Sequence, residues 1–260
     1  MILLTVLLSE LESSLIGQPI AIAMIARAYR LNCQFPATEG PRGVLTILGP
    51  RNASKAKLGK AFAKALSAVE GEEYNFITEL AEMEGANDPN VLFIDNIEEK
   101  DFSRGLARNL EEGKIGNADA SKTWIVIGTG LGSEFLSSEN RSGILRGETT
   151  LREEIFDVLE NGIVRSPLFG DHQAIDLELV DVLREGSLVL LNSLSASDYF
   201  EVIDKFLKES SGKKYPLIPQ ASMDEDSKLL FLLSLIPNLS ESNVVAGMKH
   251  FIGKQVADAR

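Results

Sequence analysis

The sequence predicts an α/β fold, namely a three-layer sandwich with a five-stranded parallel sheet, plus a helical subdomain at its C-terminal end. Short runs rich in Val, Ile and Leu recur as far as residue 191, as in strands buried on both faces of a parallel sheet. Helical stretches alternate with these runs, and beyond residue 194 only helical stretches remain. We therefore expect a sandwich over residues 1–194 and a helical subdomain over residues 195–260.

Composition limits the kinds of partner. Apolar residues make up 44% of the 260 residues and charged residues 25%, as in globular proteins. The net charge of −12 argues against broad binding to nucleic acid or to an anionic membrane, because such binding needs clustered Lys and Arg. Cys33 is the only cysteine, so an intrachain disulfide is excluded, which suits a cytoplasmic protein. We expect Cys33 to be a small buried apolar group.

Two helices are predicted before the first strand. Residues 1–14 form an amphipathic pattern in which acidic residues follow the apolar start too soon for a membrane span. The sequence LIGQ, from Leu15 to Gln18, breaks this helix, and a second apolar helix follows from about Ile20 to Leu31. The segment from Asn32 to Arg42 contains Pro36, Gly40 and Pro41, so we expect a linker into the sheet.

The central segment combines a strand, a turn and a helix. The strand is predicted over Val44–Leu48, and helical spacing of apolar residues continues as far as Leu66. The turn between them, GPRNASKA, almost fits the phosphate-binding P-loop, in which backbone N–H groups and a lysine surround a triphosphate. Gly49 and Lys55 stand where that motif requires them, but Ser54 replaces the second glycine and Ala56 the Mg²⁺-binding Ser or Thr.

The next apolar runs predict further strands at Tyr74–Ile77, Val91–Ile94 and Thr123–Ile127, with Trp124 in the core. Asp95 directly follows the second of these runs. An acid at the C-terminal end of a parallel strand lies at the edge where such sheets bind ligands, although capping of the next helix would explain it equally well. The remaining predictions between these strands are a polar connection at Val69–Glu73, a helix and a turn at Glu79–Asn90, a helix at Phe102–Leu110, and a loop at Gly113–Asp119.

GTGLGS, from Gly128 to Ser133, follows a strand and superficially matches a dinucleotide-binding loop. Ser133 replaces the third glycine, and no second strand with a ribose-binding acid follows at the usual interval. We therefore interpret the glycines as a loop.

The last part of the chain predicts one more strand and then helices. We expect a helix at Leu151–Leu159, a loop at Ser166–His172, a strand at Leu188–Leu191, a helix from Ser195 to Leu207, a hinge at Ser210–Pro216, and helices at Ser227–Ile236 and Val244–Ala257. The acidic runs Glu70–Glu73 and Asp224–Asp226 are expected to be solvated.

Taken in order, these segments resemble the AAA+ ATPases, which are P-loop NTPases, and in particular the second ATPase module of the Clp/ClpB-type protein-unfolding ATPases. LIGQ resembles the family's VVGQ box, GPRNASKA the Walker A motif, and VLFIDNIE the Walker B motif. IVIGTGLGS resembles the sensor-1 strand, and LVDVLREGSLVLL the segment with the arginine finger. LSASDYFEVIDKFLKE resembles the start of the helical lid, so the similarity spans almost the whole chain.

The resemblance implies roles for individual residues. Nucleotide would contact Leu15, Ile16, Gly49, Pro50, Arg51, Asn52, Ala53, Ser54, Lys55, Ala56 and Lys57. Asp95 matches the Walker B aspartate that holds Mg²⁺, and Asn96 stands at the catalytic glutamate. Arg184 matches the arginine finger, with an ordinary surface arginine as the alternative. Gly130 stands at the sensor-1 asparagine, and Lys249 lies near the sensor-2 arginine. We expect Lys55 and Asp95 to face each other at adjacent strand ends.

Several of these positions have lost the chemistry that the family needs. An amide such as Asn96 cannot accept a proton from water, and Gly130 has no side chain to orient that water. No Gly-aromatic-Gly pore loop lies between Lys55 and Asp95. The resemblance therefore implies a pseudo-ATPase that binds ATP or ADP, with weakened Mg²⁺ binding, and works with other protein subunits in a remodelling assembly. Those subunits would be an active AAA+ ATPase or further copies of this chain.

Two alternatives remain open. In the first, the chain is a slow but genuine ATPase chaperone in which another acid, such as Glu98, orients the water. In the second, it is a scaffold that works without nucleotide.

Overall fold

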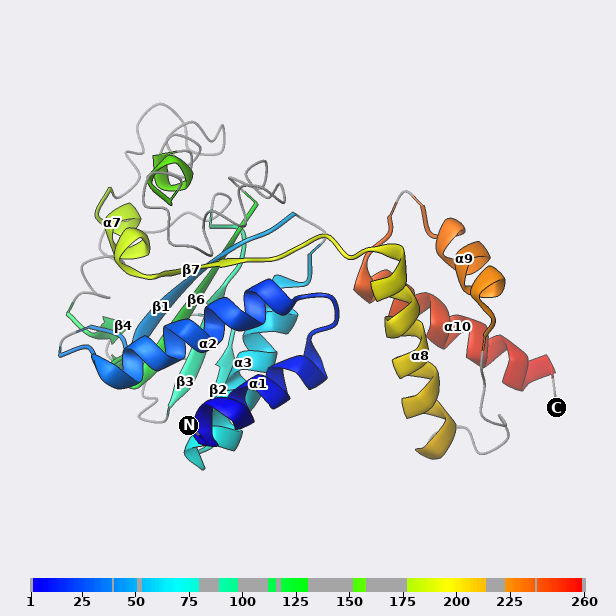
Figure 1. Ribbon diagram of the computed structural model, residues 1–260, viewed down its shortest axis with the longest axis horizontal. Helices are drawn as coiled ribbons and strands as arrows, with labels where there is room; N and C mark the ends of the chain where they lie inside the picture. Colours follow the sequence, from blue (N-terminus) through cyan, green and yellow to red (C-terminus); the bar gives the residue numbers. More distant parts are fainter. Residues whose placement is uncertain are drawn as a thin grey trace. The chain divides into compact units, whose positions relative to one another are not determined.

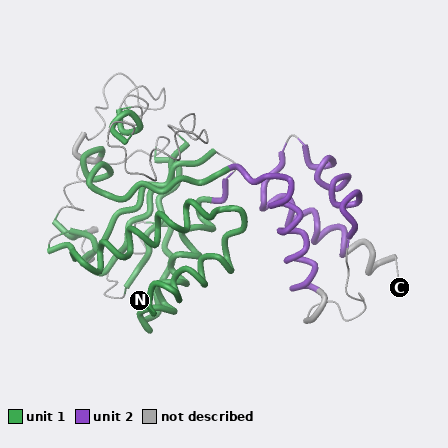
Figure 2. The backbone as a smooth tube through the Cα atoms, in the orientation of Figure 1, with its two compact units in different colours: residues 1–51, 55–192 green, residues 52–54, 193–260 purple. Residues whose placement is uncertain are grey.

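The computed structural model describes residues 2–38, 40–50, 53–79, 89–97, 112–115, 118–130, 152–157, 177–213, 223–236 and 238–258. The chain forms two compact units (Figure 2). Unit 1 comprises Met1–Arg51 and Lys55–Asn192, and unit 2 comprises Asn52–Ser54 and Ser193–Arg260. Among the described helices, none is both long and apolar enough to cross a membrane.

A parallel sheet forms the centre of unit 1, and it confirms the predicted α/β fold with five parallel strands (Figure 1). Its strands are β1 (Gly43–Leu48), β2 (Asn75–Ile77), β3 (Asn90–Ile94), β6 (Thr123–Thr129) and β7 (Ser187–Leu190). They lie in the order β2-β3-β6-β1-β7. Leu48 is paired with Thr129 of β6 and with Leu190 of β7. The C-terminal ends of β6, β1 and β7 therefore lie at one edge of the sheet.

Helices α1 (Ile2–Ser14), α2 (Pro19–Gln34) and α3 (Lys55–Glu70) lie on one side of the sheet (Figure 1). α1 packs against both α2 and α3, so it forms the outside of this layer. Phe62 of α3 meets Trp124 of β6 edge to face, with ring centroids 5.1 Å apart. Trp124 is 1% exposed, which confirms that it is a core residue.

The opposite side of the sheet is covered by α7 (Leu177–Glu185) and by the helical residues 152–157. Ile155, Phe156 and Leu183 join the side chains of β1, β3, β6 and β7 in one apolar cluster, which completes the sandwich. Arg152 donates to the carbonyl oxygens of Arg184 and Gly186, the latter at 2.7 Å. A cation at the end of α7 is favourable because the carbonyl groups there have no helical partners.

Unit 2 contains α8 (Ala196–Lys213), α9 (Glu225–Leu233) and α10 (Glu241–Asp258). Leu232, Val244 and Met248 are buried between these helices. Asp224 accepts a hydrogen bond from the backbone N–H of Ser227, so it is the N-cap of α9. This hydrogen bond lowers the pKa of the Asp224 carboxyl group. Asp224, Glu225 and Asp226 are all exposed, which confirms the predicted solvated face, and the cap is a role of Asp224 that was not predicted.

Several segments differ from the sequence-based prediction. Ser210 to Lys213 continue α8 instead of forming a hinge, and Asn32 to Gln34 continue α2 instead of starting a linker. Gly128 and Thr129 belong to β6. Lys114–Ile115 (β4) pairs antiparallel with Ala118–Asp119 (β5), where a loop was expected. Cys33 is exposed, because it lies on the outer side of α2.

Other predictions cannot be compared with the structure. The helix predicted at Phe102–Leu110 and the loop predicted at Ser166–His172 lie outside the described residues, as does most of Glu79–Asn90.

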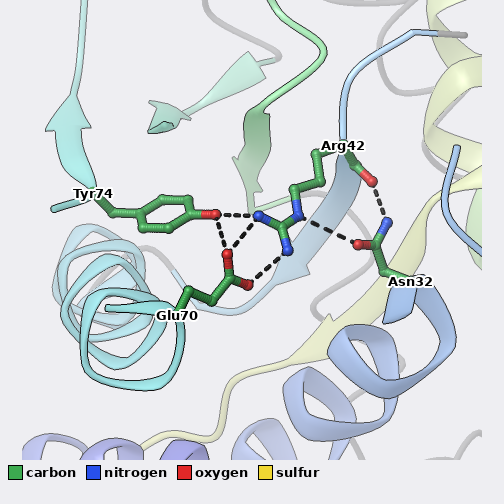
Figure 3. Close-up of polar contacts among 4 residues, drawn as sticks. All are labelled: Asn32, Arg42, Glu70 and Tyr74. Atoms are coloured by element: carbon green, nitrogen blue, oxygen red, sulfur yellow. Dashed lines mark hydrogen bonds and ion pairs between the residues drawn. The ribbon is translucent and has the colours of Figure 1, made fainter. Parts of the chain in front are cut away.

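A polar cluster joins the ends of α2 and α3 to Arg42, the residue before β1 (Figure 3). The cluster thus lies at the N-terminal end of β1, whereas Gly49 follows the C-terminal end. The Arg42 guanidinium donates to both oxygens of Glu70, at 2.6 and 2.7 Å, and also to the Tyr74 hydroxyl. Tyr74 donates to Glu70 at 2.8 Å. Asn32 donates to the Arg42 carbonyl oxygen. Glu70 is therefore not the solvated acid that was predicted.

Candidate functional site

The candidate site lies at the C-terminal edge of the sheet, where the predicted phosphate-binding residues follow the strands. Gly49 follows β1, Asp95 follows β3, and Gly128 and Thr129 end β6. The Gly49 N–H donates to the Thr129 carbonyl oxygen at 3.3 Å, which ties the start of the loop to β6. Because ligands of open α/β sheets bind at this edge, the strand ends define where a ligand would be held.

Lys55 is the first residue of α3 and is 2% exposed. Its Nζ donates to the carbonyl oxygen of Pro50 at 3.3 Å, so the side chain turns back toward the loop that precedes the helix. Buried ammonium groups need polar partners, and the loop carbonyl supplies one of them. The ammonium group thus lies beside the N-terminus of α3, where the helix dipole also favours an anion.

Asp95 lies next to Lys55, and Gly128 makes this approach possible. A Cβ atom placed on Gly128 would be 2.6 Å from Asp95 Oδ1 and 3.0 Å from Lys55 Cδ. Both contacts surround the same point, so the two side chains converge above Gly128. The prediction that they come from adjacent strands is wrong, because β6 lies between β1 and β3. Gly128 is the first glycine of GTGLGS, which was predicted to be a loop, and its role beside Lys55 and Asp95 was not predicted.

Asn96 has a φ angle of 50°, the one positive φ among non-glycine residues in the part of the chain that the structure describes. Asparagine adopts this left-handed conformation more readily than most residues. The backbone N–H of Asn96 also donates to Asp95 Oδ1 at 3.0 Å, which fixes the Asp95 carboxylate. The local backbone therefore suits asparagine better than the glutamate that the AAA+ motif has at this position.

Leu15 and Ile16, which were predicted to contact the base, are both buried in unit 1. Gln18 follows them and forms two hydrogen bonds with Asn192 beyond β7. Its Nε2 donates to the Asn192 carbonyl oxygen at 3.0 Å, and its Oε1 accepts from the Asn192 N–H at 2.9 Å. No sequence pattern indicates this pair, because the two residues are far apart along the chain.

The other predicted site residues are not all gathered at this edge. Gly130 directly follows β6 and lies at the edge. Arg184 lies in the last turn of α7 and faces carboxylates of its own unit, with Glu153 at 3.3 Å and Asp157 and Asp181 at 3.6 Å. Lys249 is exposed on α10 in unit 2.

Of the loop between Gly49 and Lys55, Arg51 and Asn52 lie outside the described residues. Ala53 and Ser54 are half-buried and group with unit 2. Ala56 and Lys57 are half-buried in the first turn of α3.

We expect Gly128→Ala to lower the affinity for any ligand whose binding depends on Lys55 and Asp95. The new methyl group would overlap Asp95 Oδ1, so the carboxylate has to move, while the stability cost should be only about 1–2 kcal/mol. Nucleotide titration and urea unfolding measure the two effects. Gly247→Ala is the control, because its methyl group would meet Phe231 in unit 2 and should change stability alone. Unchanged nucleotide affinity in Gly128→Ala would show that this edge does not bind it.

Neither a search for metal-binding side chains nor a comparison with known proteins identifies a ligand for this site. Within the described residues, no group of three or more His, Cys, Asp or Glu side chains could hold a metal ion. No protein-family model matches the chain, and no curated protein does.

Proposed function

We propose that this chain is a degenerate AAA+ module of the Clp/ClpB type that binds ATP or ADP weakly and hydrolyses ATP slowly or not at all. It would act through protein interfaces in a protein-remodelling or other macromolecular assembly. One observation carries the proposal. Lys55 and Asp95 converge above Gly128, at the ligand-binding edge of a parallel sheet and beside a helix N-terminus.

The phosphate chain is the part of the nucleotide that the site suits best. The first turn of α3 offers backbone N–H groups without helical acceptors, and the Lys55 ammonium group lies next to them. Ser54 adds a side chain where the motif needs close approach of the backbone, so binding should be weaker than in an intact P-loop.

Mg²⁺ would bind only together with the nucleotide. Asp95 supplies a carboxylate, but Ala56 lacks the hydroxyl group that usually coordinates the metal directly. Mg²⁺ commonly takes one or two carboxylates plus phosphate oxygens and water, so Asp95 with a triphosphate fits this pattern. Asp95 alone does not make a metal site.

Two groups that ATP hydrolysis requires are missing, namely a general base and a side chain that orients the attacking water. The Asn96 side chain cannot act as a general base, and its left-handed backbone does not favour glutamate at that position. Gly130 has no side chain with which to orient water. A tightly positioned water is what phosphoryl transfer requires, so a bound ATP should persist.

The surroundings of Arg184 bear on how the module would interact with other protein subunits. Arg184 pairs with three carboxylates of its own unit, so it would have to leave them to reach a neighbour's nucleotide. This cost favours a role in which the module binds other subunits, either an active AAA+ ATPase or copies of itself, without acting on their nucleotide.

Titration calorimetry with ATP and Mg²⁺ tests the proposal. We expect weak binding by the wild-type chain and an affinity about tenfold lower or worse in Lys55→Ala, because a charged hydrogen bond to phosphate contributes about 1.5–3 kcal/mol. Lys122→Ala removes an exposed lysine ahead of β6 and is the matched control. Absence of binding by the wild-type chain would favour the nucleotide-independent scaffold. ATP turnover that disappears in Asp95→Ala would instead identify a genuine ATPase.

A further inference from the structure

The groups that would attract phosphate at the candidate site belong to the chain itself. Lys55 is 2% exposed, and its Nζ donates to the Pro50 carbonyl oxygen at 3.3 Å. The first turn of α3 adds backbone N–H groups that have no acceptor within the helix. Both the ammonium group and these N–H groups attract a phosphate group directly, so neither depends on a bound metal ion.

The same site offers much less to Mg²⁺. Ala56 is half-buried in the first turn of α3 and has no hydroxyl group that could coordinate the metal. Asp95 Oδ1 accepts a hydrogen bond from the Asn96 N–H at 3.0 Å, so this oxygen has a partner without any metal. Mg²⁺ would gain the Asp95 carboxylate but not the hydroxyl ligand of an intact P-loop. We therefore expect the ion to add little to the affinity for a nucleotide.

The Asp95 carboxylate also affects which phosphate chain fits. A Cβ atom on Gly128 would lie 2.6 Å from Asp95 Oδ1 and 3.0 Å from Lys55 Cδ, so the two side chains surround one point. A terminal phosphate that reaches the Lys55 ammonium group therefore also approaches the carboxylate. In an intact P-loop, a tightly held Mg²⁺ offsets this negative charge. Without it, the extra negative charge of a triphosphate is repelled more strongly than the charge of a diphosphate.

We infer that the candidate site binds a nucleoside diphosphate without Mg²⁺, in preference to a triphosphate. The inference rests on the proposed function, which places the phosphates of ATP or ADP at this edge of the sheet but does not distinguish the two nucleotides. Lys55 and the N-terminus of α3 hold the phosphates. Asp95 selects against the terminal phosphate of a metal-free triphosphate.

Titration calorimetry with ADP and with ATP, each in Mg²⁺ and in EDTA, tests the inference. The dissociation constant for ADP should differ by less than about twofold between the two conditions, and a larger gain from Mg²⁺ would overturn the inference. In EDTA, ADP should bind at least about fivefold more tightly than ATP, and equal or tighter binding of ATP would also overturn it. Either of these contrary results would leave the proposed function intact. No binding of either nucleotide in any condition would contradict the proposed function itself.

Asp95→Asn distinguishes selection by charge from damage to the site. Loss of the negative charge should raise the affinity for ATP in EDTA about fivefold, whereas a damaged site would bind both nucleotides less well. Asp119→Asn is the matched control, because Asp119 is exposed in β5 and its replacement can still accept from the Ser121 N–H. If Asp95→Asn leaves the preference for ADP unchanged, the selection does not come from this carboxylate and the inference is wrong.

Ala56→Thr tests the contribution of the metal separately. The added hydroxyl group should make ATP binding depend on Mg²⁺, with a gain in affinity of about fivefold or more in Mg²⁺ and no gain in EDTA. Ala56→Val adds a side chain of nearly the same shape without a hydroxyl group, so its affinity should not respond to Mg²⁺. Circular dichroism verifies that each variant is folded. An equal response to Mg²⁺ in both variants would contradict the inference, because the missing hydroxyl group would then not explain the metal independence.

Discussion

Replacing Arg42 with alanine is expected to lower the free energy of unfolding by about 2–4 kcal/mol. The guanidinium group is the only described cation that contacts Glu70, whose side chain is 17% exposed. Without Arg42, that carboxylate and the Tyr74 hydroxyl keep a largely buried position but lose their strongest partner. Urea unfolding followed by circular dichroism measures the loss. The effect should be structural, because the cluster lies at the edge of the sheet opposite to the candidate site.

Two further variants separate the ion pair from general effects of truncation. Glu70→Gln retains hydrogen-bonding capacity, so it should lower the free energy of unfolding by less than Arg42→Ala does. Lys122→Ala removes an exposed cation and should stay within about 0.5 kcal/mol of the wild type. Burial raises the pKa of the Tyr74 hydroxyl, and its hydrogen bond to Glu70 raises it further, so Tyr74 remains a donor at neutral pH. A loss within about 0.5 kcal/mol for Arg42→Ala would show that Glu70 is adequately solvated without it.

The strands of the sheet were predictable because burial on both faces of a strand requires a continuous run of apolar residues in the sequence. The runs at Val44–Leu48 and Val91–Ile94 each match a strand to within one residue. β4 and β5 are too short to produce such a run. Apolar periodicity therefore gives the sheet and its helices, but not the small hairpin.

The polar contacts were not predictable in the same way, because their partners are set by the tertiary structure. Glu70 stands in a run of acidic residues, and nothing near it in the sequence indicates Arg42, 28 residues earlier. Gln18 and Asn192 are separated by 174 residues. A similar limit applies to the candidate site. The sequence indicated Lys55 and Asp95, but it did not indicate that β6 lies between β1 and β3 in the sheet.

Restoring the lost P-loop groups is the prediction with the largest expected effect on function. Ser54→Gly and Ala56→Thr together should raise the affinity for ATP with Mg²⁺ by about tenfold or more. The glycine lets the backbone approach the phosphates, and the threonine hydroxyl coordinates the metal. Titration calorimetry measures the change. Ser54→Ala with Ala56→Val alters the same two positions but supplies neither the glycine nor the hydroxyl group, and it is the matched control.

Adding Asn96→Glu to these two changes should create or raise ATP hydrolysis, because it supplies the general base that the site lacks. The gain will be limited, since the φ angle of 50° at residue 96 costs glutamate about 1 kcal/mol more than asparagine. Asn96→Gln in the same background carries the same backbone strain but no base, so it should remain inactive in a phosphate-release assay. If the three substitutions together bring no gain in ATP affinity, residues 49–56 are not an eroded P-loop, and the convergence of Lys55 and Asp95 serves the stability of the sheet edge alone.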